Sequence, residues 1–453
     1  MTDLTKADVT TPAVVLKFDP NVMHHGGLGA IRSLGRLGVP VYGVHEDRWA
    51  PAAGSRYLRG RMFWRPSPDH AERTLAGLAR LATLIGRPAV LIPTDDAGAI
   101  FLAEHADQLR GPFLFASPPP SLPRRLAGKY SLYQLCRELG LPVPLTALAG
   151  SPGQAAAFAA GAGFPLVAKL TTPWTGSGLR STTIVTGQAQ LAELVAACER
   201  AGTGLMLQEH IPGGPGADWF FHGYCDAGSA ARAAFTGVKD RSYPAHAGLT
   251  SLGRAARNDS LRAEITALLA LLRYRGIADL DLRRDARTGH YKLLDFNPRL
   301  GAQFRLFRDP DGVDVVVAAY LDLTGQPVTA AEPVAGRRFL VENYDPIGAL
   351  AYWRRGELSP RAWLDSVRAV DETAWFARDD LRPFGLMCLR MGWRGVSRRF
   401  SPGPAARHSG EPRFRPGRTA TGRDAAPATH RQARPEPGRP AGRLAHSHRG
   451  GQL

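Results

Sequence analysis

Short β-rich runs alternate with helix-length segments through the first 116 residues of the chain. The β-rich runs are Ala13–Phe18, Val39–Val44, Ala89–Asp96 and Pro112–Ala116, and a glycine-rich turn, His25–Gly29, opens the first helical segment. Parallel strands need a long crossover connection, usually a helix, whereas antiparallel strands are joined by tight turns. The alternation therefore predicts a small parallel α/β domain.

The pattern changes after three consecutive prolines, Pro118–Pro120, which interrupt regular structure. Beyond them, helices are accompanied by strands that come in pairs. Asp218–Asp226 is followed by Ala230–Val238, and Ala278–Asp285 by Gly289–Asn297. Strands paired through turns, with helices beside them, favour antiparallel sheets rather than a second doubly wound unit.

Charge and composition separate the last part of the chain from the rest. Residues 394–453 contain thirteen arginines and three acidic residues, so they carry +10 of the net charge of +17. This segment is rich in Pro, Gly and Ser without apolar periodicity, so we expect it to be disordered. The predicted organisation is an α/β domain over 13–118, a second domain over 119–328, a small appended region over 329–393 and a disordered basic tail over 394–453.

The same charge distribution limits the classes of partner. Outside the tail the net charge is only +7, so we expect no specific nucleic-acid partner, with binding through the arginine tail kept as an alternative. Four widely spaced cysteines argue against a disulfide framework and a zinc site. No signal-peptide pattern and no run of roughly 18 apolar residues is present, so we expect a cytoplasmic protein without a membrane partner.

Two acidic strands offer oxygen ligands for a cation. Asp295 and Asn297 stand two residues apart before Pro298, so both point to one face of a strand, and Asp281 lies in a similar strand upstream. Magnesium prefers oxygen ligands and usually shares them with substrate phosphates. Arg299 adds a planar donor suited to phosphate or carboxylate. The alternative is a set of solvated strand-edge acids, and this segment alone does not separate the two.

Other segments favour a phosphate-bearing ligand. Lys169 lies in the apolar run Leu166–Leu170, where its charge needs a partner, either a phosphate or a buried acid. Thr175–Gly178 is either a loop that closes over phosphates or a plain turn. Leu205–Ile211 runs from apolar to polar before Pro212, as expected of a hinge beside a flat heterocycle.

With these motifs in this order, residues 13–328 resemble the ATP-grasp superfamily, and specifically its carboxylate–amine ligases of the D-aspartate-ligase-like group. The resemblance implies a small pre-ATP-grasp domain followed by a two-lobed ATP-grasp fold with antiparallel sheets and ATP between its lobes. The implied ATP-binding residues are Lys129, Lys169, Gln208, Glu209, Ile211 and Asp218. The implied magnesium ligands are Asp281, Asp295 and Asn297, and the implied catalytic residues are Arg299, Lys239 and Arg241.

The resemblance also implies an activity. It is that of an ATP- and Mg²⁺-dependent ligase, with Mn²⁺ as a substitute, that joins an amino-acid-like carboxylate to an amine through an acyl phosphate. The partners are then two small molecules, and a homodimer is left open. Asp295 departs from the family, which usually has a glutamate there. Other phosphoryl-transfer or carboxylase-type chemistry on the same fold remains an alternative.

The N-terminal glycine turn supports a weaker alternative. Gly27 and Gly29 follow a strand, and Glu46 lies about 20 residues further on, as in a nicotinamide-binding fingerprint. Arg32 stands where the third glycine belongs. We therefore favour a structural or substrate-lining role for this turn over a nicotinamide-dependent oxidoreductase.

Overall fold

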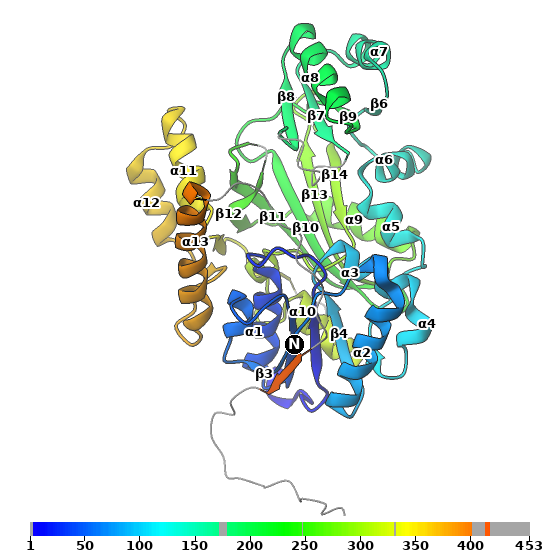
Figure 1. Cartoon of the computed structure of the whole chain (residues 1–453), viewed down its shortest axis with the longest axis vertical. Helices are drawn as coiled ribbons and strands as arrows, with labels where there is room; N and C mark the ends of the chain where they lie inside the picture. The colour runs from blue at the N-terminus through cyan, green and yellow to red at the C-terminus, as the bar shows by residue number, and fades with distance from the viewer. Residues whose placement is uncertain (1–2, 172–178, 247, 330–331, 401–412, 417–453) are drawn as a thin grey trace, which may run out of the picture. The chain divides into compact units, whose positions relative to one another are not determined.

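Three sheets organise the part of the chain that the structure describes, which is residues 3–171, 179–246, 248–329, 332–400 and 413–416. The computed structural model assigns these residues to one compact unit, Met1–Arg418. Figure 1 follows this unit from the blue N-terminal sheet through the green sheets to the yellow and orange C-terminal helices.

The first sheet has the strand order β17-β3-β2-β1-β4-β5, with β1 to β5 parallel. Helices α1 and α10 pack on one face and α2 and α3 on the other, which is why the whole of β1 is apolar and buried. The predicted parallel α/β domain is confirmed. Its elements are β1 (Ala13–Leu16), α1 (Gly26–Leu37), β2 (Val41–His45), β3 (Leu58–Phe63), α2 (Ala71–Ile85), β4 (Ala89–Pro93), α3 (Asp96–Glu104), α4 (Ala106–Leu109) and β5 (Phe113–Leu114).

A small antiparallel sheet follows, with the strand order β6-β9-β7-β8. Helices α7 and α8 cover it, and α7 begins after Ser151, whose hydroxyl accepts a hydrogen bond from the backbone N–H of Gln154 at 3.3 Å. The elements are α5 (Leu122–Ala127), α6 (Lys129–Glu138), β6 (Thr146–Ala149), α7 (Pro152–Ala162), β7 (Leu166–Leu170), β8 (Thr182–Val185), α8 (Gln188–Arg200) and β9 (Leu205–Glu209).

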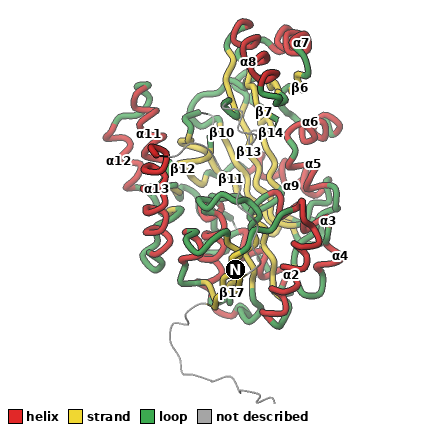
Figure 2. The backbone as a smooth tube through the Cα atoms, in the orientation of Figure 1, coloured by secondary structure: helices red, strands yellow, loops and turns green. Residues whose placement is uncertain are grey.

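The large sheet has the order β14-β13-β10-β11-β12-β15-β16, and its strands from β14 to β15 are antiparallel, as predicted. One face is apolar and packs on α5, α6 and α9, whereas the opposite face combines polar residues with apolar residues of β10 and β11 that pack in the core containing α10. Figure 2 shows these strands in the interior with helices around them. The elements are β10 (Asp218–Cys225), β11 (Ala231–Tyr243), β12 (Leu249–Ala255), α9 (Asp259–Leu271), β13 (Gly276–Arg284), β14 (Tyr291–Asn297) and α10 (Val315–Leu323).

The region predicted as a small appended part, 329–393, adds two short strands to this sheet. Strand β15 (Arg338–Leu340) pairs with β12, and β16 (Glu372–Thr373) pairs with β15. Helices α11 (Asp345–Arg354), α12 (Pro360–Arg368) and α13 (Arg382–Phe400) begin in the same region. The sequence did not indicate these pairings, because short edge strands have too few residues to show a strand period.

Two segments of the tail that the sequence predicts to be disordered, 394–453, form regular structure. Helix α13 continues to Phe400, since extending an existing helix needs no new nucleus. Arg413–Pro416 forms β17, which pairs antiparallel with β3 and so covers an open sheet edge. The other residues of the tail lie outside the described part of the chain.

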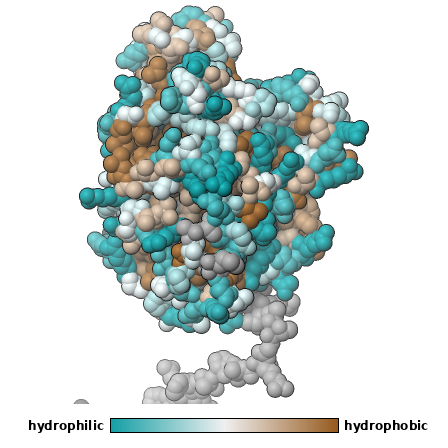
Figure 3. Space-filling model, turned by 180° about the vertical axis from the view of Figure 1, so that it is seen from behind, coloured by the Kyte–Doolittle hydropathy of each residue, from teal (hydrophilic) through white to brown (hydrophobic). Residues whose placement is uncertain are grey.

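The outer surface combines hydrophilic and apolar residues. Within the described residues, no helix has the length and apolar character needed to cross a membrane. Seen from behind, the molecule is hydrophilic over much of its face, with an apolar area along the left edge of Figure 3.

Buried histidines in the parallel domain make stability depend on pH. Burial, together with the charges of Lys17 and Arg61, lowers the pKa of His45 to about 3. The unfolded side chain titrates near 6.5, so between pH 6.5 and about 3 the unfolded chain binds a proton that the folded chain does not. This stability is therefore present above pH 6.5 and is lost as the pH falls.

We expect His45→Gln to remove this dependence. Between pH 6 and pH 4, the unfolding free energy of the wild type should fall relative to the variant by about 1.4 kcal/mol per pH unit. Urea titrations at several pH values measure the difference. A difference that stays constant with pH would contradict the buried neutral state of His45.

Candidate active site

Polar side chains form a row across the face of the large sheet that is not packed on α9. Asp281 of β13 faces Asp295 of β14, and Asp279 faces Asn297 on the same two strands. Directly opposed residues share a face, with Cβ atoms roughly 5 Å apart. The structure therefore brings the predicted magnesium ligands Asp281, Asp295 and Asn297 together.

Lysines from three other elements balance the charge of the two facing carboxylates. Burial raises the pKa of Asp295, and the negative charge of Asp281 adds to that rise. The positive charges of Lys129, at the start of α6, and of Lys169, in β7, lower the pKa of Asp295 in turn. Lys239 of β11 places its Nζ 3.5 Å from Asp281 Oδ1. Two facing carboxylates can bind a metal ion, and the lysines around them can bind the phosphates that the metal ion contacts.

The donor set fits magnesium. In the described part of the chain, no three His, Cys, Asp or Glu side chains converge as a metal site. The set is therefore two carboxylates, Asp281 and Asp295, completed by the amide oxygen of Asn297. Magnesium accepts such oxygen ligands and takes phosphate oxygens and waters for its remaining positions.

Lys169 reaches this acidic centre from the small sheet. Its Nζ donates a hydrogen bond to Gln208 Oε1 at 2.9 Å, and no acidic side chain among the described residues forms an ion pair with it. Burial lowers its pKa to about 8 and the nearby charge of Lys129 lowers it further, while Asp295 opposes the shift. Of the two predicted partners, a buried acid is not found, which leaves room for a phosphate.

The hinge strand is fixed by charges that the sequence analysis did not assign. The Glu209 carboxylate forms ion pairs with Arg287 and with Lys292, the latter at 3.0 Å, and accepts the backbone N–H of Leu145 at 3.1 Å. Glu209 was predicted to contact ATP. Its side chain instead anchors the end of β9, so any nucleotide contact of this hinge falls to the backbone and to Gln208.

Arg283 connects the hinge to Asp218, the predicted ribose ligand. It donates to the carbonyl of Ile211 at 2.8 Å and to that of Gly213 at 3.2 Å, and its Nη1 bonds Asp218 Oδ1 at 2.6 Å. The sequence analysis missed Arg283, although its position two residues after Asp281 puts it on the same face of β13. Ile211 and Asp218 thus lie together at the end of the polar row.

Arg241 does not join this group, contrary to the prediction. Its guanidinium makes two 2.8 Å hydrogen bonds to Asp345 and one of 2.8 Å to Ser366. A β-bulge at Asp240 breaks the strand alternation between Lys239 and Arg241, so only Lys239 faces Asp281. Arg241 therefore fixes α11 against β11.

Arg299 lies where the large sheet meets the parallel domain. Its Nη1 donates to Asp279 Oδ2 at 2.7 Å and to the carbonyl of Leu300 at 3.1 Å, and its Nε lies 3.4 Å from Oδ1 of Asp96 at the start of α3. No feature of the sequence indicated the contact with Asp96, because Asp96 is about 200 residues away in the chain. Arg299 is thus a cation held next to the predicted magnesium ligand Asn297.

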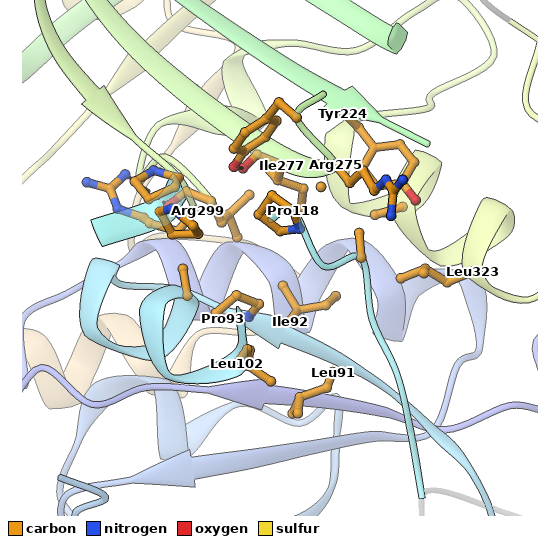
Figure 4. Close-up of a pocket in the computed structure, with 18 residues that line it drawn as sticks. Leu91, Ile92, Pro93, Leu102, Pro118, Tyr224, Arg275, Ile277, Arg299 and Leu323 are labelled. Carbon is orange, nitrogen blue, oxygen red and sulfur yellow. Dashed lines mark hydrogen bonds between the residues drawn. The ribbon is translucent and has the colours of Figure 1, made fainter. Parts of the chain in front are cut away.

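An apolar cavity lies behind Arg299, between β4 and α3 on one side and the large sheet on the other. Figure 4 shows Arg299 and Arg275 at opposite sides of it, with Pro118 between them. The hydroxyls of Tyr224 and Tyr274 on its wall donate to Asp322 at 2.6 Å and to the carbonyl of Ile277 at 2.7 Å. This cavity does not suit phosphates, so we place the candidate site on the sheet face.

Packing accounts for the N-terminal glycine turn. A Cβ at Gly29 would lie 2.7 Å from the Phe304 ring, so this glycine allows α1 to pack closely against the segment around Phe304. Glu46, the acid of the nicotinamide fingerprint, forms a buried ion pair with Lys17. These contacts favour the structural role. His25, in the same turn, is buried, and burial lowers its pKa to about 4.

The predicted glycine- and threonine-rich loop, Thr175–Gly178, lies outside the described residues. Cys136 and Cys198 are buried, as are Phe220, Phe221 and Tyr224 of β10.

Comparisons with known proteins agree with this architecture. No family model matches the chain. D-aspartate ligase of Enterococcus faecium (strain Aus0004) is 26% identical over 230 residues, which is 47% of this chain and 53% of the ligase. The chain therefore spans about half the length of the curated relative it matches.

Solved structures are similar in fold at low sequence identity. N5-carboxyaminoimidazole synthetase from Staphylococcus aureus superposes with a TM-score of 0.54 at 9% identity, covering 73% of this chain and 81% of that one. The biotin carboxylase domain of Hydrogenobacter thermophilus 2-oxoglutarate carboxylase, with ADP, its magnesium salt and bicarbonate, gives 0.50 at 14% identity over 72% and 73%. At these identities the likeness shows a shared fold, and it is the ATP-grasp fold.

Proposed function

We propose that the protein is an ATP- and Mg²⁺-dependent ligase that joins a carboxylate to an amine through an acyl phosphate. One observation carries the proposal: Asp281 and Asp295 oppose each other on the large sheet, and Lys169 of the small sheet and Lys129 of α6 lie near enough for their charges to lower the pKa of Asp295. ATP would lie between the two sheets. The similarity to D-aspartate ligase supports an amino-acid-like carboxylate as the acid.

Different residues along the polar row would bind different parts of the substrates. Ile211, Gln208 and Asp218 would hold the adenosine end, and Lys129 and Lys169 the phosphates. Asp281, Asp295 and Asn297 would hold magnesium, or Mn²⁺ in its place. The cation would neutralise phosphate charge during the transfer. Arg299 and Lys239 would stabilise negative charge that develops where the acid reacts.

The proposed reaction has two steps. An oxygen of the acid attacks the γ-phosphorus of ATP, the bond to the bridging oxygen breaks, and ADP and an acyl phosphate form. The amine nitrogen then attacks the acyl carbon and loses a proton, and inorganic phosphate leaves with the electron pair of the C–O bond. Holding both substrates beside Arg299 lets the second step proceed before water reaches the acyl phosphate.

A screen of amino-acid pairs for ADP release tests this proposal. We expect ADP and phosphate only when an acid and an amine are both present, with one ¹⁸O atom passing from a labelled carboxylate into phosphate. ADP release with an acid alone would indicate kinase-like transfer instead.

Carboxylase-type chemistry is the second candidate, with bicarbonate in place of the organic acid. The similarity to a biotin carboxylase domain whose structure contains bicarbonate favours it. ADP release that requires bicarbonate and an amine, but no organic acid, would replace the first proposal by this one.

A further inference from the structure

Asp279 lies in the polar row beside the predicted magnesium ligands but was given no role. It is buried, with 4% of its surface exposed, and it is the cross-strand neighbour of both His222 on β10 and Asn297 on β14. Its Oδ2 accepts one hydrogen bond from Asn297 Nδ2 at 3.3 Å and one from Arg299 Nη1 at 2.7 Å. One carboxylate oxygen therefore holds two side chains of the candidate site.

The first of these hydrogen bonds determines which way the Asn297 amide points. An asparagine amide has an oxygen that can bind a metal and an NH₂ group that cannot. An ionised carboxylate only accepts hydrogen bonds, so Asp279 draws the NH₂ group toward itself. The amide oxygen of Asn297 is thereby directed away from Asp279 and is left for the cation.

Packing holds the Asp279 carboxylate in place. A Cβ at residue 301 would lie 2.7 Å from Asp279 Cγ and 2.2 Å from His222 Cε1, so Gly301 is pressed against both side chains. His222 is fully buried, and its ring centroid lies 5.1 Å from that of Phe307. His222 Nε2 stands 3.1 Å from Asp279 Oδ1, but at an angle that makes no hydrogen bond.

We propose that Asp279 is a positioning residue: it orients the amide oxygen of Asn297 toward magnesium and holds the Arg299 guanidinium beside it. This inference rests on the proposed function and deepens it, because it concerns how the magnesium site is built. Groups that orient a metal ligand in this way commonly change metal affinity 10- to 100-fold when they are removed.

The test is a double-mutant cycle on Mn²⁺ binding. Binding is measured as the loss of the electron paramagnetic resonance signal of free Mn²⁺ in the presence of a non-hydrolysable ATP analogue. Asp279→Asn should weaken Mn²⁺ binding about 10- to 100-fold, because its own NH₂ group then competes with that of Asn297. In the Asn297→Asp background the same change should cost less than about twofold, since both oxygens of an aspartate are equivalent. A purely structural role for Asp279 would not distinguish the two backgrounds.

Asp226→Asn is the matched control, because Asp226 is also a buried acid paired with an arginine, Arg232, at 2.6 Å. It should leave Mn²⁺ affinity unchanged. Thermal midpoints of all variants show whether they fold. If Asp279→Asn alone does not fold, the double variant Asp279→Asn/Asn297→Asp still provides the test, and it should bind Mn²⁺ within about fivefold of the wild type.

Four results would contradict these statements, one of them the proposed function and the other three the positioning role. A wild type that binds no Mn²⁺ with the nucleotide analogue would refute the proposed function itself. A wild type that binds, with an Asp279→Asn variant that binds equally well, would refute the positioning role alone. An equal loss in both backgrounds, or a folded double variant that does not bind, would also refute it.

Discussion

Asp295→Asn should abolish ADP formation while the protein still folds. The carboxylate of Asp295 faces that of Asp281 across two strands, and the two together supply the charge that binds magnesium. An amide of the same size keeps the packing but removes half of that charge, so turnover should fall at least on the order of 10²- to 10³-fold. Because burial disfavours the Asp295 charge, the thermal midpoint of the ligand-free variant should equal or exceed that of the wild type.

Asp295→Glu is the matched variant. It restores the residue that the family usually has and lengthens the side chain by one methylene, so activity should survive with metal binding as tight or tighter. ADP formation is measured against Mg²⁺ concentration for all three proteins. An Asp295→Asn enzyme that turns over normally with an unchanged Mg²⁺ requirement would show that Asp295 is only a charged residue at the edge of a strand and does not bind the metal.

Lys169→Met should separate nucleotide binding from folding. Burial lowers the pKa of Lys169 to about 8, and its hydrogen-bond acceptor is an amide rather than an acid, so its charge opposes folding. Below pH 8 both the folded and unfolded side chains are protonated, and this cost is constant. Methionine keeps the apolar stem, so the ligand-free variant should be as stable as the wild type or more stable.

Lys169→Met should weaken ATP binding, although it does not destabilise the ligand-free protein. At a hundred times Kd, Mg-ATP should raise the unfolding free energy of the wild type by about 2.7 kcal/mol. If Kd rises a hundredfold in the variant, the same ATP concentration gives only about 0.4 kcal/mol. Urea titrations with and without Mg-ATP measure both quantities, and an unchanged ATP effect in Lys169→Met would show that no phosphate contacts this lysine.

Lys17→Met provides the contrasting control. Lys17 is nearly as buried, with 11% of its side chain exposed, but it forms an ion pair with Glu46 in the parallel domain. Its removal leaves a buried carboxylate without its partner, so the ligand-free protein should lose stability. The stabilisation by Mg-ATP should remain, because this pair lies outside the candidate site.

The sequence predicted the parts of the fold that have a local signal. Alternating β-rich and helical segments indicated the parallel domain, and strands joined by turns indicated the antiparallel sheets. The two-residue spacing of Asp295 and Asn297 correctly placed both on one strand, and the cross-strand register brings Asp281 to them. These features follow from strand periodicity, which short sequence windows contain.

The failures came from contacts between distant segments and from local irregularity. The family resemblance grouped Arg241 with Lys239, but the bulge at Asp240 turns Arg241 toward Asp345. Glu209 matched a nucleotide-contacting motif, yet its partners Arg287 and Lys292 come from a hairpin about 80 residues later. No sequence window contains such pairs, and neither the contact of Arg299 with Asp96 nor that with Asp279 has a local signature.

Calorimetric titration of the wild-type protein with a non-hydrolysable ATP analogue, with and without Mg²⁺, tests the central claim most directly. The arrangement of Lys129, Lys169, Asp281 and Asp295 predicts one nucleotide per chain, with binding that requires Mg²⁺ and is lost in Asp295→Asn. No saturable binding, or the same affinity after Mg²⁺ is removed by chelation, would contradict a magnesium–nucleotide site between the two sheets.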